Sequence, residues 1–165
     1  GVMKRVGELY TKSLGGLIVK FWNVYGIEKD MEKAHVITDF IRKGFETGVI
    51  DMMTDGTEAR EFLYAEDCCE ALEIIMGHYD KLSSDDELHI TTGSHTTILE
   101  IARIIQRLFS TIDKEVVITR SECIDEVQKD ARNKPDPYIQ KFWRAKTSVK
   151  EGLSKVFFKM RNDYE

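Results

Sequence analysis

Residues 87–119 read ELHITTGSHTTILEIARIIQRLFSTIDKEVVIT, and this stretch decides the fold class. ELHITTG at its start and KEVVIT at its end are typical of short strands. Between them, residues 97–109 place apolar side chains at helical spacing, and Thr97 with Glu100 forms a T-x-x-E capping box at the start of this helix. Strand, helix and strand in succession predict an α/β or α+β domain.

The same alternation extends along the rest of the chain. Helices are predicted at 2–14, 35–48, 65–79 and from Ser148 onward, and strands at 17–22, 49–53 and 61–64. Glycines end the first two of these helices, and Ser148 with Glu151 repeats the capping box. The segments between the predicted elements are read as a loop at 23–26, a turn at 54–60 and an irregular region at 121–146.

Composition limits the class of protein. The 165 residues carry a net charge of −5, with 42% hydrophobic and 32% charged residues, as in an ordinary soluble globular protein. The basic residues are scattered, which disfavours nucleic-acid binding, and no apolar run approaches the roughly 20 residues that span a bilayer. Three cysteines form no disulfide framework and fit a reducing, cytoplasmic setting, and the four histidines lack the spacing of a metal site.

Three polar residues are candidates for binding: Asn23, Arg60 and Arg132. Asn23 lies where a predicted strand ends, and ligands collect at strand ends in open α/β sheets. Arg60 follows a tight turn and precedes an apolar strand, a setting in which a guanidinium can hold a phosphate bidentately. A surface or capping role explains each of them equally well, and Lys4 taken alone is read as a solvated surface lysine.

Seven short motifs follow one another in a recognisable order. They are GVMKRVGE (1–8), KFWNVYG (20–26), HVITDFI (35–41), DGTEAREFLYAEDCCEAL (55–72), LHITTGS (88–94), TILEIARII (97–105) and AKTSVKEGL (145–153). Together they resemble the C-terminal half of the extended short-chain dehydrogenase/reductases, the NAD-dependent nucleotide-sugar epimerases, dehydratases and decarboxylases.

The resemblance implies an α/β fold, the C-terminal half of a Rossmann-type enzyme with its small substrate-binding subdomain. Residues 1–165 would form a single truncated unit. In it, the end of the dinucleotide-binding domain (about 1–26, with 50–92 in part) interleaves with the substrate-binding subdomain (about 27–50 and 93–165).

The resemblance also assigns catalytic chemistry to the first helix. The family carries Tyr-x-x-x-Lys in a Y-G-x-S-K-x-x-G-E stretch, and GVMKRVGE matches it from the glycine onward, with Lys4 as the lysine. The tyrosine and the glycine-rich NAD loop would precede Gly1, so we expect an inactive fragment of a longer enzyme. In that enzyme an ammonium about 4 Å from the phenol favours the phenolate by up to about 4 kcal/mol. The tyrosine then takes a proton from a sugar hydroxyl while hydride passes to NAD or NADP. Lys4 and Trp22 would contact this cofactor.

The expected substrate is a nucleotide-diphosphate sugar, and its first two contacts lie in recognisable motifs. Asn23 matches the asparagine of R-x-x-N-x-Y-G, although Lys20 replaces the arginine and Ile27 replaces the proline that usually follows. Arg60 belongs to an intact D-G-x-x-x-R-x-F-x-Y-x-x-D motif, whose arginine binds the diphosphate in the family.

Weaker matches complete the expected substrate site. Lys33, His35 and Val36 would approach the nucleotide. Arg132 would be a second phosphate contact, although the L-G-W-x-P pattern that usually precedes the last helix is degraded to KFWRAK.

A homodimer is the expected assembly. In the family the first helix packs against its symmetry mate, and here Val2, Val6, Leu9 and Ser13 would lie near that surface. Two alternatives remain open: a module that binds nucleotide sugars without redox chemistry, and a degenerate relative that serves only as a dimer scaffold.

Overall fold

The computed structural model describes residues 1–28, 30, 34–83, 85–125 and 134–164. Its α-helices are α1 (Val2–Ser13), α2 (Val36–Thr47), α3 (Ala65–Gly77), α4 (Ile98–Ser110) and α5 (Val149–Arg161). Two short 3-10 helices, η2 (Tyr79–Lys81) and η3 (Pro137–Lys141), lie in the connections. Each α-helix coincides with a segment that the sequence predicts to be helical, although α4 ends one residue beyond its predicted segment, and the fold is α/β as expected.

The strands form four short pairs. β1 (Val19–Phe21) pairs with β6 (Leu88–Ile90), β2 (Asn23–Tyr25) with β5 (Phe62–Tyr64), and β3 (Val49–Met52) with β8 (Val117–Arg120), all in parallel. β4 (Ala59–Arg60) and β7 (Thr96–Thr97) form an antiparallel pair. The prediction of a loop at 23–26 is therefore wrong for residues 23–25. These residues form a strand because they pair with β5. The local sequence pattern does not reveal this pairing, because β5 lies far along the chain.

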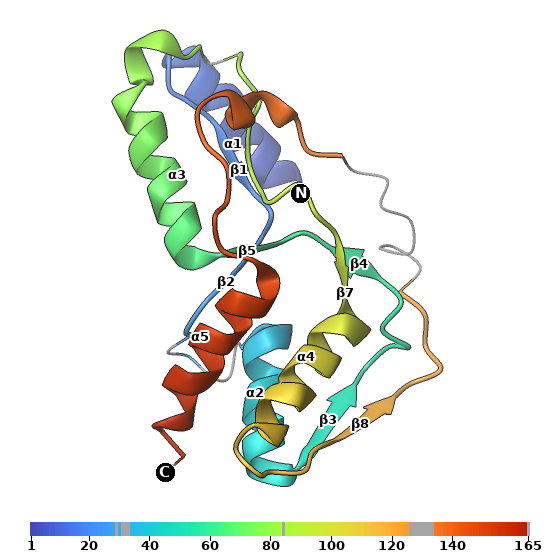
Figure 1. Ribbon diagram of the computed structural model, residues 1–165. Helices are drawn as coiled ribbons and strands as arrows, with labels where there is room; N and C mark the ends of the chain where they lie inside the picture. The colour runs from blue at the N-terminus through green and yellow to red at the C-terminus, as the bar shows by residue number, and fades with distance from the viewer. Residues whose placement is uncertain (29, 31–33, 84, 126–133, 165) are drawn as a thin grey trace.

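The elements gather into two groups above and below the β2–β5 pair (Figure 1). In the upper group, α1, α3 and η3 surround β1, and in the lower group α2, α4 and α5 pack beside β3 and β8. Each group has its own hydrophobic core. Successive side chains of a strand point to opposite faces, so β5 contributes Phe62 and Tyr64 to the lower core and Leu63 to the upper core. This strand lies at the junction where the candidate site forms.

Local signals set most helix ends. α4 begins with the predicted capping box, in which the Thr97 hydroxyl accepts from the Glu100 amide and the Glu100 carboxylate accepts from the Thr97 amide. At α5 the Ser148 hydroxyl accepts from the Glu151 amide at 3.2 Å. Gly48 ends α2 with φ of 71°, a left-handed conformation that glycine adopts without steric cost.

The segment predicted to be irregular, 121–146, contains more order than expected in its described parts. The Asp136 side chain accepts from the Tyr138 amide at 2.8 Å and starts η3, with Pro137 in the first turn. Ile139 and Trp143 are buried in the upper core, so hydrophobic burial holds this helix in place.

Among the described helices, none is long and apolar enough to cross a membrane.

Candidate functional site

A cleft of about 590 Å³ opens where β2 and β5 end and where α2 and α3 begin. Its volume is within the range of small-molecule sites. Five of the residues predicted from the sequence line it: Trp22, Asn23, His35, Val36 and Arg60. The cleft thus brings together side chains from four segments that are separate in sequence.

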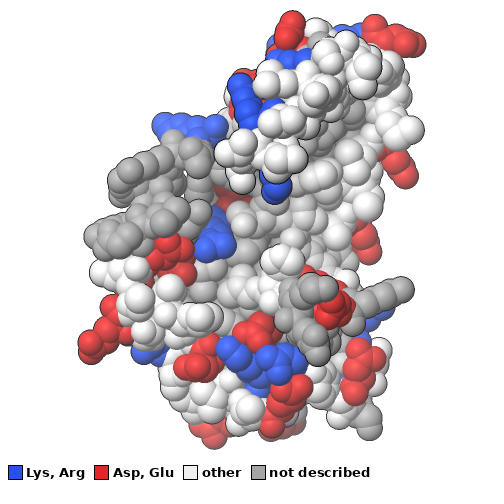
Figure 2. Space-filling model, turned by 180° about the vertical axis from the view of Figure 1, so that it is seen from behind, with Lys and Arg blue, Asp and Glu red and all other residues white. Residues whose placement is uncertain are grey.

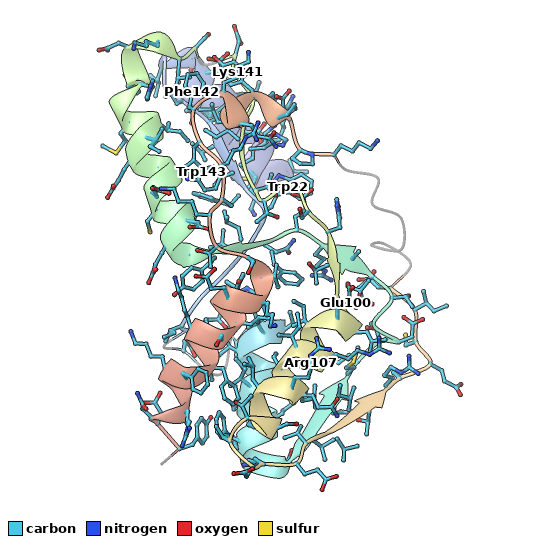
Figure 3. The ribbon with its side chains drawn as sticks, viewed as in Figure 1. Trp22, Glu100, Arg107, Lys141, Phe142 and Trp143 are labelled. Carbon is cyan, nitrogen blue, oxygen red and sulfur yellow. The ribbon has the colours of Figure 1, made fainter. Side chains whose placement is uncertain are left out.

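Trp22 marks the point where the chain changes pairing partner. Residues 19–21 pair with β6, whereas residues 23–25 pair with β5. At the crossover the Trp22 amide donates to the Ile90 carbonyl at 3.4 Å, and the Val24 amide donates to the Trp22 carbonyl at 2.7 Å. In the view of Figure 3, Trp22 is labelled to the right of Trp143 and above Glu100, which marks the start of α4. In open α/β sheets, ligands bind in the crevice outside the carboxyl ends of the strands.

Asn23 is fixed at the start of β2 by one carbonyl. Both its backbone amide and its side-chain Nδ2 donate to the Glu61 carbonyl, at 3.2 and 3.3 Å. This double anchor holds the Asn23 side chain at the cleft wall.

Arg60 is the one arginine among the described residues that line the cleft, and it already has an anionic partner. Its Nη2 lies 3.3 Å from Asp125 Oδ2, and the two side chains are 33% and 21% exposed. The Nε atom of Arg60 is buried without a hydrogen-bond partner among the described residues. An oxyanion that entered the cleft would therefore meet the exposed part of this guanidinium, beside Asp125.

The start of α2 forms the rim of the cleft. His35 is the N-cap residue, and its amide donates to Glu28 Oε2 at 2.8 Å while its ring contacts Glu28 Oε1. Burial acts to raise the pKa of Glu28, but the hydrogen bonds from His35 outweigh it and lower that pKa below its ordinary value. Lys33, the neighbouring predicted contact, lies outside the described residues, as does Arg132.

The remaining wall is apolar and chemically quiet. Burial raises the pKa of Tyr25 above its ordinary value, and its hydroxyl donates to the Val149 carbonyl at 3.4 Å. Cys68 also lines the cleft, and burial raises the pKa of its thiol, which disfavours the reactive thiolate. In the described part of the chain, no three His, Cys, Asp or Glu side chains gather as metal ligands.

Lys4 is the predicted site residue that the structure leaves apart from the cleft. It lies on α1, is exposed and does not line the cleft. No residue of α1 is buried, and Val2, Met3 and Leu9 are 79%, 79% and 59% exposed. The amphipathic helix therefore presents its apolar side chains to solvent in this chain.

Sequence reasoning missed two acidic residues, Glu28 and Glu61, that organise the site. Glu61 is 1% exposed, yet in the sequence it is only an acid beside Arg60. Its position immediately before the apolar strand 62–64 is the one local signal that could have indicated a buried carboxylate. Asp67, the last residue of the D-G-x-x-x-R-x-F-x-Y-x-x-D motif, has a structural role, because its carboxylate accepts from Thr147 N and Oγ1 just before α5.

Charge on the face seen in Figure 2, behind the view of Figure 1, is mixed. Figure 2 shows Lys and Arg interleaved with Asp and Glu there, with no continuous basic patch on the described part. That face gives no support to nucleic-acid binding.

Comparison with known proteins gives a consistent result. The model of the NAD-dependent epimerase/dehydratase family matches residues 2–91. A GDP-L-fucose synthase of Sinorhizobium fredii is 29% identical over 159 residues, which cover 91% of this chain and 49% of the relative. A putative UDP-glucose 4-epimerase of Methanocaldococcus jannaschii is 26% identical, with 99% of this chain and 53% of the relative covered.

Solved structures show the same fold. An epimerase of Methanothermobacter thermautotrophicus superposes with a TM-score of 0.82 at 19% identity, covering 99% of this chain and 50% of that one. The UDP-glucose 4-epimerase of Thermotoga maritima, solved with UDP-glucose, gives 0.78 at 23% identity, covering 100% and 54%. The chain spans about half the length of the relatives it matches.

Proposed function

This chain belongs to the NAD-dependent epimerase/dehydratase family, and we propose that its cleft binds the diphosphate of a nucleotide sugar. The observation that carries the proposal is the position of Arg60, which lies in one cleft with Asn23 and His35. A guanidinium fork matches the oxygens of a diphosphate, and the apolar wall beside it suits the faces of a nucleoside and a sugar.

The ligand would compete with the protein's own carboxylate. Asp125 holds Arg60 in the described structure, and a diphosphate would either displace it or bind beside it. Asn23 would contact the ligand from the end of β2, and His35 and Val36 would do so from the start of α2. Lys33 and Arg132 remain predicted contacts.

For the whole protein we propose hydride transfer at a sugar hydroxyl, assisted by a Tyr/Lys pair with Lys4 as the lysine. The product class, by epimerisation, dehydration or decarboxylation, and the choice of NAD or NADP stay open. The interleaved division of the chain into the end of a dinucleotide-binding domain and a substrate-binding subdomain stays a prediction. A cytoplasmic location is proposed from the three cysteines, all of which are free.

The described cleft offers a cation for one diphosphate. Among its described lining residues Arg60 is the one arginine, with no lysine beside it, so a nucleotide sugar and NAD would not share this cation. Lys4 lies outside this lining, which leaves Trp22 as the predicted cofactor contact within it. We assign this cation to the nucleotide sugar, because Arg60 belongs to the motif whose arginine binds the diphosphate of the nucleotide sugar in the family.

A homodimer through α1 is part of the proposal. The exposed apolar side chains of α1, Val2 and Leu9 among them, would be covered by the same helix of a second copy. Sedimentation of the wild-type chain and of Leu9→Glu tests this: the wild type should sediment as a dimer and the variant as a monomer. Monomeric wild-type protein would contradict it.

The rival function is a module that binds nucleotide sugars without catalysis. Calorimetric titration of UDP-, GDP-, CDP- and dTDP-sugars into the chain separates the two. Tight binding without NAD favours the module, and binding only when the N-terminal half of the enzyme is supplied favours the enzyme half.

An arginine pair provides the control for these titrations. Arg60→Ala should weaken binding by about 10- to 150-fold, the value of a charge-assisted hydrogen bond of about 1.5–3 kcal/mol. Arg107→Ala, on α4 (Figure 3) and outside the cleft lining, removes the same charge and should leave binding unchanged. Equal effects of the two variants would contradict the assignment of the cleft.

A further inference from the structure

Glu61 is the most deeply buried charged side chain described in the protein, at 1% exposed. Its Oε2 accepts from the Gly93 amide at 3.0 Å and from the Thr91 hydroxyl, and its Oε1 lies 3.6 Å from His95 Nδ1. A carboxylate is this well buried only where such donors replace water. All three partners belong to one loop, residues 91–95.

That loop joins the two strand pairs that carry the cleft. It leaves β6, which pairs with β1 just before Trp22. It enters β7, in which Thr96 pairs with Arg60. Gly93 turns the loop with φ of 72°, a left-handed conformation, and its amide is one of the donors to Glu61. By holding the loop, the Glu61 side chain fixes β7 against β4, the strand that presents Arg60.

The backbone of Glu61 acts on the other side of the cleft. Its carbonyl accepts both the amide and the side-chain Nδ2 of Asn23. One residue therefore anchors Asn23 through its main chain and, through its side chain and the loop, the strand of Arg60.

We infer that Glu61 is a positioning residue that sets the relation of Asn23 to Arg60 across the cleft. The inference rests on the proposed function for its effect on binding, but the geometry it describes belongs to the ligand-free protein. Glu61 thus fixes the distance between Asn23 and Arg60 before a ligand binds. Binding sites require their contacting groups to be placed within about 0.5 Å of the productive geometry.

A second buried carboxylate in the same segment provides the control. Glu58 is 5% exposed, and its Oε1 accepts from the Thr54 hydroxyl at 2.6 Å within its own turn. Neither Glu58 nor Thr54 lines the cleft. Replacing a carboxylate that only stabilises the fold should therefore leave ligand affinity unchanged, as expected for Glu58. Replacing a positioning residue should weaken ligand binding.

The experiment compares Glu61→Ala with Glu58→Ala in the full chain, below the melting temperature of each variant. UDP-glucose affinity is measured by calorimetry, and hydrogen exchange of the Gly93 amide by NMR. For Glu61→Ala we expect binding weaker by roughly tenfold or more and faster exchange at Gly93, because a displaced site loses affinity steeply. Glu58→Ala should bind within about twofold of wild type, as expected of a site outside the network, with Gly93 exchange unchanged.

Equal losses of affinity in the two folded variants, or unchanged affinity in Glu61→Ala, would overturn the inference. If the wild type does not bind UDP-glucose, the proposed function is contradicted for this ligand. The role of Glu61 is then tested by NMR without ligand. In that experiment, the NMR signals of Asn23 Nδ2 and Arg60 Nε should shift in Glu61→Ala and stay in place in Glu58→Ala. Unshifted signals in Glu61→Ala would overturn the positioning role itself.

Discussion

Replacing Asp125 with asparagine should strengthen binding of a diphosphate ligand. At 3.3 Å and an effective dielectric near 20, the Arg60–Asp125 pair has a Coulomb energy of about 5 kcal/mol. Both side chains reach water, so solvent screening reduces the net value to about 0.2–1 kcal/mol. A ligand that displaces Asp125 must overcome this energy, and one that binds beside Asp125 meets its repulsion. Removing the charge therefore lowers the Kd by about 1.4- to 5-fold if the ligand displaces Asp125, and it also lowers the Kd, by relief of the repulsion, if the ligand binds beside Asp125.

The assay is calorimetric titration of UDP-glucose into wild type, Asp125→Asn and a matched control. Asp85→Asn is the control, because Asp85 also pairs with a cation at 3.3 Å, Lys12, but lies away from the cleft. We expect tighter binding in Asp125→Asn alone, with the difference shrinking as salt screens the pair. Weaker binding in Asp125→Asn, or the same gain in Asp85→Asn, would refute the competition between Asp125 and the ligand.

Three further predictions concern stability. Gly44→Ala would place a Cβ 2.2 Å from Cε2 of the buried Phe109 ring, so calorimetric unfolding should show a loss of about 1–3 kcal/mol; an unchanged melting temperature would contradict the close α2–α4 packing. Because the pKa of Glu28 is lowered on folding, its stabilising effect is present above the ordinary glutamate pKa of about 4.3 and is lost as pH falls through the lowered value. Urea unfolding between pH 6 and pH 3 should therefore lose less stability in Glu28→Gln than in wild type, and parallel curves would count against the His35 hydrogen bonds as the cause. Asp67→Ala should cost about 1–3 kcal/mol, because it leaves the Thr147 donors without their acceptor, and a variant that melts like wild type would show that water replaces the carboxylate.

Helices could be predicted from the sequence because their signals are local. The capping residues Thr97 and Ser148 and the terminating Gly48 each act within a few residues of the helix end that they define. The strand β2 could not be predicted, because residues 23–25 become extended only by pairing with residues 62–64. The two-residue strands β4 and β7 likewise exist only as a pair. The helix η3 could have been predicted, since Asp136 followed by Pro137 is a local helix-start signal.

The candidate site divides in the same way. Arg60, Asn23 and His35 could be named from motifs, and the fold brings them to one cleft. Glu61 could not be assigned, because its role depends on a loop thirty residues further along the chain, residues 91–95. Asp125 could not be predicted as a partner of Arg60, because it belongs to no recognised motif. The path of the chain after β8 brings it beside Arg60. Lys4 was named from its motif, and because it lies on α1 away from the cleft, its proposed chemistry stays a prediction.

The most direct test of the central claim is a crystal structure of this chain with UDP-glucose bound. The account predicts that the diphosphate lies in the cleft between β2 and α2, with its oxygens in hydrogen-bond contact with the Arg60 guanidinium and the sugar or nucleoside beside Asn23. A ligand bound instead along α4, with Arg60 still paired to Asp125, would contradict it.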